Sequence, residues 1–231
     1  MIVCGINKTT LLDYPGRVAC TIFLGGCNFR CPFCQNSSLV LDPAKQVPIP
    51  EEEIFSFLKK RQGILDGVCI SGGEPTIDPS LPDLLRKIRE LGYDIKLDTN
   101  GSRPETVKSL YREGLISKVA MDIKACPDNY AALTGLSLPD TGALKETAAF
   151  LMNSGIEYEF RTTVVRELHT ERDFEEIASW LSGAEEYYLQ AYRDSDTVIR
   201  PGFTACTEEE MQTYRDILGS TMTKVEIRGM D

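Results

Sequence analysis

Short apolar segments alternate with amphipathic helical segments along most of this 231-residue chain. Six apolar segments are predicted as strands: residues 17–26, 66–74, 94–101, 117–124, 158–165 and 186–192. Each is short and bounded by glycine or polar residues, which is typical of strands buried in a parallel sheet. The intervening segments show helical spacing of apolar residues. Glycines suited to helix ends follow them: Gly92, Gly114, Gly155, Gly183 and Gly219. This alternation predicts right-handed βαβ units in a parallel sheet.

The number of these units sets the expected architecture. A closed eight-fold barrel takes about 250 residues, so we expect an α/β fold with a partial (β/α)6 barrel, open-sided, with mainly parallel strands. A doubly wound open sheet is the alternative. Because no linker or repeat interrupts the chain, residues 1–231 are expected to form a single domain. Its core would span residues 17–195, and residues 196–231 would add an extra strand and helix.

Charge and hydropathy argue against several classes of protein. The formal net charge of −10 argues against a nucleic-acid partner bound through a basic surface. No apolar run reaches the roughly 18–20 residues of a membrane span, and the first residues lack the basic and apolar regions of a signal peptide. We therefore expect a cytoplasmic protein with no membrane partner.

Three of the eight cysteines, Cys27, Cys31 and Cys34, lie in one short segment, which we call the cysteine loop (residues 25–36). In a reducing compartment a disulfide framework is not expected. We interpret the scattered cysteines as small buried apolar side chains: Cys4, Cys20, Cys69, Cys126 and Cys206.

The cysteine loop suits an iron–sulfur cluster better than the alternatives. A structural zinc needs four ligands, and the only histidine, His169, lies far along the chain. A thioredoxin-like pair would leave Cys27 surplus. Thiolates are the usual ligands of iron–sulfur clusters, and with three of them a [4Fe-4S] cluster keeps one iron open to a non-protein ligand.

Polar or glycine-rich residues follow nearly every predicted strand. They are the cysteine loop, "SGGEPT" (71–76), "DTNG" (98–101), "MDIK" (121–124), "RTT" (161–163) and "LQAYR" (189–193). Ligands bind at the carboxyl ends of the strands in parallel α/β folds. Together, the six segments indicate an active site at that edge.

The cysteine spacing, with Phe33 before the last cysteine and "SGGEP" on the next strand, resembles the signature of the radical S-adenosylmethionine (SAM) enzymes. This resemblance implies that SAM binds the open iron and is cleaved by the reduced cluster to methionine and a 5′-deoxyadenosyl radical. It also implies that Gly72, Gly73 and Glu74 receive the methionine amino group. Glycines allow such a close approach of backbone carbonyls, and Glu74 offers a negative charge to the ammonium.

Residues 11–36, 97–101 and 121–125 further resemble the glycyl-radical-enzyme activases, in particular the activating protein of the anaerobic ribonucleoside-triphosphate reductase. The resemblance implies that the partner is a glycyl radical enzyme, with that reductase as the first candidate, and that a flavodoxin or ferredoxin donates the electron. It implies a cofactor pocket formed by these residues: Phe33, Gln35, Asn36, Gly72, Gly73, Glu74, Asp98, Thr99, Asn100, Asp122, Lys124, Arg161 and Gln190.

Within that pocket, Asp122 and Lys124 stand two apart on a strand and would point to the same side. Such a pair suits the zwitterionic methionine end of SAM or a monovalent cation near Asp98 and Asp122. Arg161 within a strand is costly to bury unless it is paired. The alternative interpretations are an exposed strand-end ion pair for Asp122 and Lys124, and an outward-facing salt bridge for Arg161.

The sequence also departs from the activases. Gln35 stands where they often have histidine, and "LQAYR" contains no histidine where pyruvate formate-lyase activases carry one. Residues 35–68 contain no cysteine, so no additional clusters are expected there. Two alternatives remain open: a radical SAM enzyme acting on a small molecule or peptide, such as 7-carboxy-7-deazaguanine synthase, and a zinc-binding or electron-carrying module.

Overall fold

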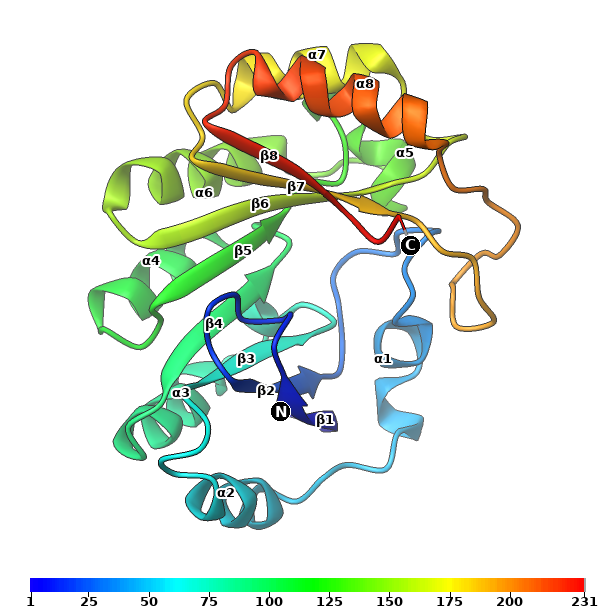
Figure 1. The fold of residues 1–231 in the computed structure, drawn as a ribbon. Helices are drawn as coiled ribbons and strands as arrows, with labels where there is room; N and C mark the ends of the chain where they lie inside the picture. The colour runs from blue at the N-terminus through cyan, green and yellow to red at the C-terminus, as the bar shows by residue number, and fades with distance from the viewer. Residues whose placement is uncertain (231) are drawn as a thin grey trace. The chain divides into compact units, whose positions relative to one another are not determined.

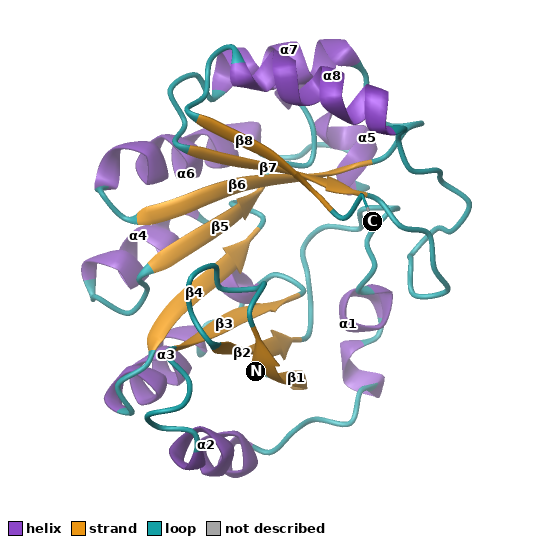
Figure 2. Ribbon diagram, in the orientation of Figure 1, coloured by secondary structure: helices purple, strands orange, loops and turns teal. Residues whose placement is uncertain are grey.

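A computed structural model describes residues 1–230 (Figures 1 and 2). Its strands are β1 (Val3–Thr10), β2 (Ala19–Leu24), β3 (Gly67–Gly72), β4 (Asp94–Thr99), β5 (Lys118–Asp122), β6 (Glu157–Val164), β7 (Glu186–Ala191) and β8 (Lys224–Arg228). Its α-helices are α1 (Ser37–Leu41), α2 (Glu51–Lys60), α3 (Leu81–Glu90), α4 (Pro104–Arg112), α5 (Tyr130–Thr134), α6 (Thr141–Ser154), α7 (Glu171–Trp180) and α8 (Glu208–Gly219).

The strands follow the order β1 to β8 in an eight-stranded sheet. The expected α/β fold with mainly parallel strands is therefore confirmed, and each of the six predicted strands is present, as β2 to β7. The chain divides into two compact units. Unit 1 comprises Met1–Asn28, Ser38–Thr99 and Arg103–Ala120, and unit 2 comprises Phe29–Ser37, Asn100–Ser102 and Met121–Asp231. The single-domain organisation expected from the sequence stays a prediction.

In unit 1, β2, β3 and β4 pair in parallel, while β1 pairs with β2 in the antiparallel direction. The register places Ile70 beside Leu97, so the next residues, Ser71 and Asp98, share the carboxyl edge of the two strands. Helix α3 buries one apolar face: Leu81, Leu84, Leu85 and Ile88. That burial is what attaches the helix to the sheet, because helix propensity alone stabilises so short a helix only marginally.

In unit 2, β6, β7 and β8 pair in parallel. The register places Arg161 beside Tyr188 and Thr163 beside Gln190, so these polar side chains share one face of the sheet. Helices α7 and α8 pack against each other beside β7 and β8 (Figure 2). Each begins with a capping box, from Thr170 in α7 and from Thr207 in α8, which satisfies backbone amides that the first turn leaves without partners.

Glycines end the helices as predicted, although one of them lacks the left-handed conformation. Gly92, Gly114, Gly155 and Gly183 all have positive φ, which lets the chain leave each helix in the left-handed conformation. Gly219 is instead the last residue of α8, and Ser220 caps the helix with a right-handed conformation. Helix α8 therefore ends at Gly219 as predicted, but without a left-handed glycine, because the amide of Ser220 still bonds to carbonyls of the last turn.

A tight turn precedes β2. Gly16 has φ 78°, and the amide of Arg17 donates to the carbonyl of Tyr14 at 3.1 Å. This is the geometry of a type II turn with Pro15 in its second position.

Candidate active site

The cysteine loop contains no helix or strand and follows directly after β2. Cys31 is buried, whereas Cys27 and Cys34 are partly exposed. The amide of Cys34 donates to the carbonyl of Cys31 at 3.0 Å, which closes a tight turn between the two thiols. All eight cysteines are thiols rather than disulfides.

Of the scattered cysteines, four are buried as expected (Cys20, Cys69, Cys126 and Cys206), whereas Cys4 is partly exposed. Burial raises the pKa of Cys20 and that of Cys126 to about 12, and the pKa of Cys206 to about 11. These thiols are protonated at neutral pH and are poor metal ligands. Cys126 is not merely apolar, because its thiol donates to a carboxylate oxygen of Asp173 at 3.1 Å.

Within residues 1–230, no group of three or more histidine, cysteine, aspartate or glutamate side chains is arranged to hold a metal ion. Whether the cysteine loop suits an iron–sulfur cluster is therefore decided by the chemistry of its donor atoms. Cys27, Cys31 and Cys34 offer thiols, which as thiolates are the usual ligands of iron–sulfur clusters. Cys31 and Cys34 also interact electrostatically with Lys124, a cation of the same unit, and these interactions raise the pKa of Lys124. The donor set fits a cluster that the loop would hold through these three side chains.

The glycines of the "SGGEP" bend have no room for side chains. A Cβ atom on Gly73 would lie 1.9 Å from the carbonyl oxygen of Gly26, and one on Gly72 would lie 2.3 Å from the carbonyl oxygen of Leu24. The amides of Gly73 and Glu74 donate to those same carbonyls, each at 2.8 Å. The bend is thus joined backbone-to-backbone to the start of the cysteine loop.

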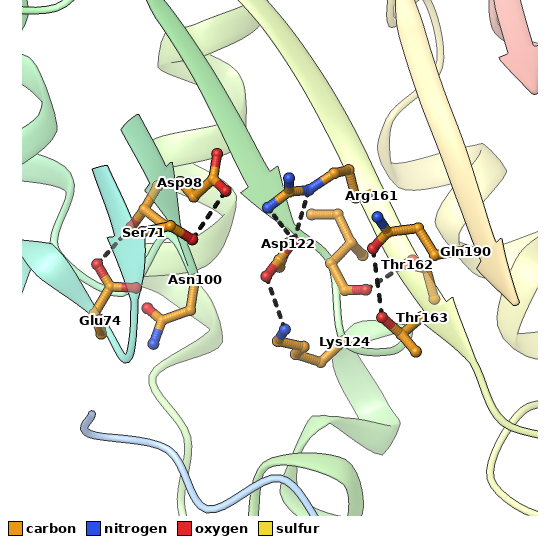
Figure 3. A network of polar contacts seen from close by, with 12 residues as sticks. Ser71, Glu74, Asp98, Asn100, Asp122, Lys124, Arg161, Thr162, Thr163 and Gln190 are labelled. Atoms are coloured by element: carbon orange, nitrogen blue, oxygen red, sulfur yellow. Dashed lines mark hydrogen bonds and ion pairs between the residues drawn. The ribbon is translucent and has the colours of Figure 1, made fainter. Parts of the chain in front are cut away.

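Glu74 is 2% exposed, and its carboxylate accepts hydrogen bonds from other residues of the chain. One oxygen accepts from the Thr76 amide at 3.0 Å, from the Thr76 hydroxyl at 2.5 Å and from the Thr99 hydroxyl at 2.7 Å. These bonds tie the bend to the end of β4, where Asp98 accepts from the Ser71 hydroxyl at 3.0 Å (Figure 3).

Lys96, which is not among the predicted site residues, is completely buried and pairs with Asp98 at 2.5 Å. It could have been found as a charged residue between the apolar Ile95 and Leu97, two positions before Asp98. In unit 2, Asn100 accepts from the Ser102 amide at 3.0 Å, as in an Asx turn.

Asp122 lies between two cations in unit 2 (Figure 3). One of its oxygens accepts from Lys124 at 3.0 Å, and the other accepts from Arg161, also at 3.0 Å. Burial alone would raise the pKa of Asp122, but Arg161 and Lys124 outweigh it and lower the pKa to about 2. Burial alone would lower the pKa of Lys124, but the Asp122 carboxylate and electrostatic interactions with Cys31 and Cys34 raise it. The three side chains therefore stay charged at neutral pH.

This ion-pair network continues to the C-terminal strand. Glu159, 1% exposed, lies 3.9 Å from Arg161 and 3.7 Å from Arg228 of β8. The Arg228 guanidinium also stacks on Tyr188, 3.3 Å from the ring centroid. Glu159 could have been found as the residue two before Arg161 on the same strand face, but nothing in the sequence pairs it with Arg228.

Gln190 and Gln35 lie in different surroundings within unit 2. Gln190 accepts from the Thr163 hydroxyl at 3.5 Å, on the strand face that also carries Arg161 (Figure 3). Gln35 is exposed, and its amide donates to the carbonyl of Arg193 at 2.8 Å. Asn36 beside it is half-buried.

His169 is remote from the cysteines in sequence but contacts the cysteine loop. Its ring meets the Phe33 ring edge-on, with 6.4 Å between centroids. Nδ1 accepts from the Val165 amide at 3.1 Å, so Nε2 carries the proton and donates to the carbonyl of Lys124 at 3.0 Å. The Lys124 amide in turn donates to Tyr130 at 3.0 Å. His169 thus supports both Phe33 and Lys124.

No helix within residues 1–230 combines the length and hydropathy that crossing a membrane requires.

The family comparison supports the chemistry of this site. The radical SAM superfamily model matches residues 21–181, which is more than half of the chain. The chain therefore belongs to the radical SAM superfamily. Membership implies an enzyme that uses a [4Fe-4S] cluster and SAM.

Two proteins of similar sequence have more specific names within this superfamily. A protein of Methanocaldococcus jannaschii, provisionally named as a glycyl-radical enzyme activating enzyme, is 32% identical over 200 residues, which cover 84% of this chain and 81% of the relative. A 7-carboxy-7-deazaguanine synthase of Methanopyrus kandleri is 26% identical over 48% of this chain and 51% of that protein.

Solved structures share the fold. A domain of the pyruvate-formate lyase-activating enzyme from Bacteroides vulgatus has a TM-score of 0.58 at 22% identity, covering 71% of this chain and 99% of that domain. Streptococcus suis SuiB bound to SAM has a TM-score of 0.68 at 15% identity, covering 90% of this chain and 52% of SuiB.

Proposed function

We propose that this radical SAM enzyme is a glycyl-radical-enzyme activating enzyme. The observation that carries the proposal is the relative provisionally named as such an activating enzyme, whose 32% identity extends over 84% of this chain. When bound, the cluster and SAM supply one electron and a 5′-deoxyadenosyl radical, which takes a hydrogen atom from a glycine Cα of the partner. The residues of this chain bind and orient these groups.

Each part of the site has a proposed role. Cys27, Cys31 and Cys34 hold the cluster. The bend at Gly72 and Gly73 receives the methionine amino group on its backbone carbonyls, because the Glu74 carboxylate already accepts three bonds from the protein.

The network that includes Asp122 receives the methionine carboxylate. It has three basic residues, Lys124, Arg161 and Arg228, against two acidic ones. An excess of positive charge in a mostly buried place favours an anionic group. We include the other predicted pocket residues in the same site: Phe33, Gln35, Asn36, Asp98, Thr99, Asn100 and Gln190.

The monovalent cation expected near Asp98 and Asp122 stays a prediction. Each carboxylate already has a basic partner: Lys96 for Asp98, and Lys124 with Arg161 for Asp122. A cation would have to compete with these side chains, so its binding depends on an opening of the pairs.

For the partner, we propose the anaerobic ribonucleoside-triphosphate reductase, with a flavodoxin or ferredoxin as electron donor. The residues that support this choice are 11–36, 97–101 and 121–125, which carry the resemblance to the activating protein of that reductase. The absence of further cysteines in residues 35–68 agrees with an activase that has no additional clusters.

The test is anaerobic incubation of the reconstituted protein with SAM, a reductant and each of several candidate glycyl radical enzymes. We expect an organic radical signal in electron paramagnetic resonance, located on the partner's glycine and absent without SAM. SAM cleavage without a radical on any of these partners would contradict the proposal.

A second candidate function is supported by the partial likeness to 7-carboxy-7-deazaguanine synthases, one of which matches 33% identically over 39% of this chain. The same incubation, run with the small-molecule substrate of that synthase, distinguishes the two. Substrate-dependent formation of 5′-deoxyadenosine there would favour the second candidate.

A further inference from the structure

A segment between β7 and α8, residues 193–200, lies along the cysteine loop. Both this segment and residues 29–37 belong to unit 2. Three backbone hydrogen bonds join them: Ile199 N–H to the Cys34 carbonyl at 3.0 Å, Arg200 N–H to the Pro32 carbonyl at 2.8 Å, and Ser37 N–H to the Thr197 carbonyl at 3.2 Å. The Gln35 side chain adds a fourth, to the Arg193 carbonyl at 2.8 Å.

These bonds matter because the cysteine loop has no helix or strand of its own. Its backbone polar groups must find partners outside regular structure, and the 193–200 segment supplies them on both sides of Cys34. The contacts surround one proposed cluster ligand rather than the loop as a whole.

The segment is itself held in shape by Asp194. One carboxylate oxygen accepts from the Tyr192 hydroxyl at 2.7 Å, and the other accepts from the Gly202 amide at 3.0 Å. Tyr192 is 1% exposed, so the start of the segment is anchored in the core, and Val198 in its middle is also buried. An exposed segment with such anchors can restrain what it contacts.

We propose that residues 193–200 act as a positioning element for the cluster. They fix the backbone around Cys34, and in this way they set the environment of the iron that Cys34 would hold. Hydrogen bonds and solvent exposure around the ligands tune iron–sulfur clusters. This inference rests on the assignment of the cluster to the cysteine loop under the proposed function, and it is independent of the partner's identity.

Three pairs of variants of the full chain test the proposal. Ile199→Pro removes the amide that donates to Cys34, and Ile199→Ala is its control, since it shortens the side chain but keeps the amide. Asp194→Ala removes both restraints on the segment, and Asp194→Asn keeps an acceptor. Gln35→Ala is matched by Gln62→Ala, because the exposed Gln62 amide donates to the carbonyl of Leu91 at 2.9 Å, outside the cysteine loop.

The first readout is amide hydrogen exchange of residues 31–37 in the chain without its cluster. Loss of one such bond should raise the exchange rates roughly 3- to 10-fold in Ile199→Pro and Asp194→Ala. Ile199→Ala and Gln62→Ala should match the wild type, and Asp194→Asn should lie between. Gln35→Ala carries less weight, because Gln35 is also a proposed pocket residue.

The second readout is the reduced cluster of the reconstituted protein. We expect Ile199→Pro to shift the midpoint potential and the electron paramagnetic resonance spectrum, while iron content and thermal stability stay as in Ile199→Ala. A merely structural segment would lower stability without changing the spectrum.

Different outcomes would refute the positioning role, the ligand assignment and the proposed function. If exchange in residues 31–37 is the same in Ile199→Pro and Ile199→Ala, or if exchange rises while potential and spectrum stay unchanged, the positioning role is refuted. If Cys34→Ala retains a normal cluster, the proposed ligand assignment fails, whatever the exchange data show. If a cluster forms normally and no partner is activated, only the proposed function is contradicted.

Discussion

At the scale of single residues, Gly73 is the glycine at which the surrounding backbone leaves the least room for a side chain. A Cβ atom there would meet the carbonyl oxygen of Gly26, which cannot move without displacing the start of the cysteine loop. We expect Gly73→Ala to lower the free energy of unfolding by about 1–3 kcal/mol, as overpacking does, and to weaken SAM binding. Urea unfolding and equilibrium SAM binding measure the two effects.

The control for that change is Gly219→Ala. Gly219 lies in helix α8, has no positive φ, and its added Cβ would meet nothing within 4 Å. Stability and SAM binding should stay unchanged or improve slightly, since alanine favours helix. Equal losses in both variants would show that the clash at Gly73 is not the cause.

A second prediction at this scale concerns the replacement of single cysteines by alanine. Alanine at Cys27, Cys31 or Cys34 should abolish the visible absorbance of the reconstituted cluster and the cleavage of SAM. Cys20→Ala should preserve both, because burial raises the pKa of that thiol to about 12 and keeps it protonated. Iron analysis and product chromatography measure the outcome, and a cluster retained in any of the three loop variants would contradict the assignment.

Because His169 is buried, we expect the free energy of unfolding to depend on pH. Burial lowers the pKa of His169, although the carbonyls of Lys124 and Val165 and the charge of Asp173 oppose that shift. The unfolded chain then binds a proton more readily than the folded chain below about pH 6.5. The contribution of neutral His169 is therefore complete above that pH and is lost as the pH falls below it.

The measurement is the urea midpoint at pH 7.5 and at pH 5.5 for the wild type and for His169→Gln. His169 is the only histidine of the chain, which makes the comparison simple. We expect the wild type to lose more stability than the variant between the two values. An equal loss would mean that His169 is not responsible.

At the scale of elements, β8 extends the ion pairs of β5 and β6. Glu159→Gln should lower the free energy of unfolding by about 1–3 kcal/mol, because it removes a buried charge between two arginines. Arg228→Gln should cost less, about 0–1 kcal/mol, since that side chain is one-third exposed and solvent screens it.

A double-mutant cycle of Glu159→Gln and Arg228→Gln, measured by urea unfolding, isolates the coupling of the pair. The two changes should together cost less than the sum of the single changes. Additive effects would show that the 3.7 Å approach carries no energy.

The elements themselves were largely predictable. Each strand from β2 to β7 coincides with a predicted segment, because a buried parallel strand is a continuous apolar run that local sequence reveals. Helix α5 was not predicted, since its five residues are too few to show a period. The role of residues 193–200 was not predictable either, because they are polar and irregular and contact the cysteine loop mainly through backbone atoms.

At the scale of the whole molecule, cofactor binding should stabilise the folded chain. A ligand that binds only the folded state at about 100 times its dissociation constant adds about 2.7 kcal/mol. We expect SAM to raise the unfolding temperature of the cluster-loaded protein under anaerobic conditions. Removal of the cluster by a chelator, or Cys34→Ala, should eliminate the shift, and an undiminished shift in either case would mean that SAM binds elsewhere.

The sequence by itself determined what depends on near neighbours in the chain. Alternating apolar and amphipathic segments specify the parallel α/β fold, and the spacing of Cys27, Cys31 and Cys34 predicts the chemistry of the loop, because both are local patterns. Only the tertiary structure decided which remote residues surround that chemistry. It brings His169 to Phe33, residues 193–200 to Cys34, and Arg228 to Glu159. These contacts depend on how packed elements and backbone groups satisfy one another across more than 60 positions of sequence, and no local pattern encodes them.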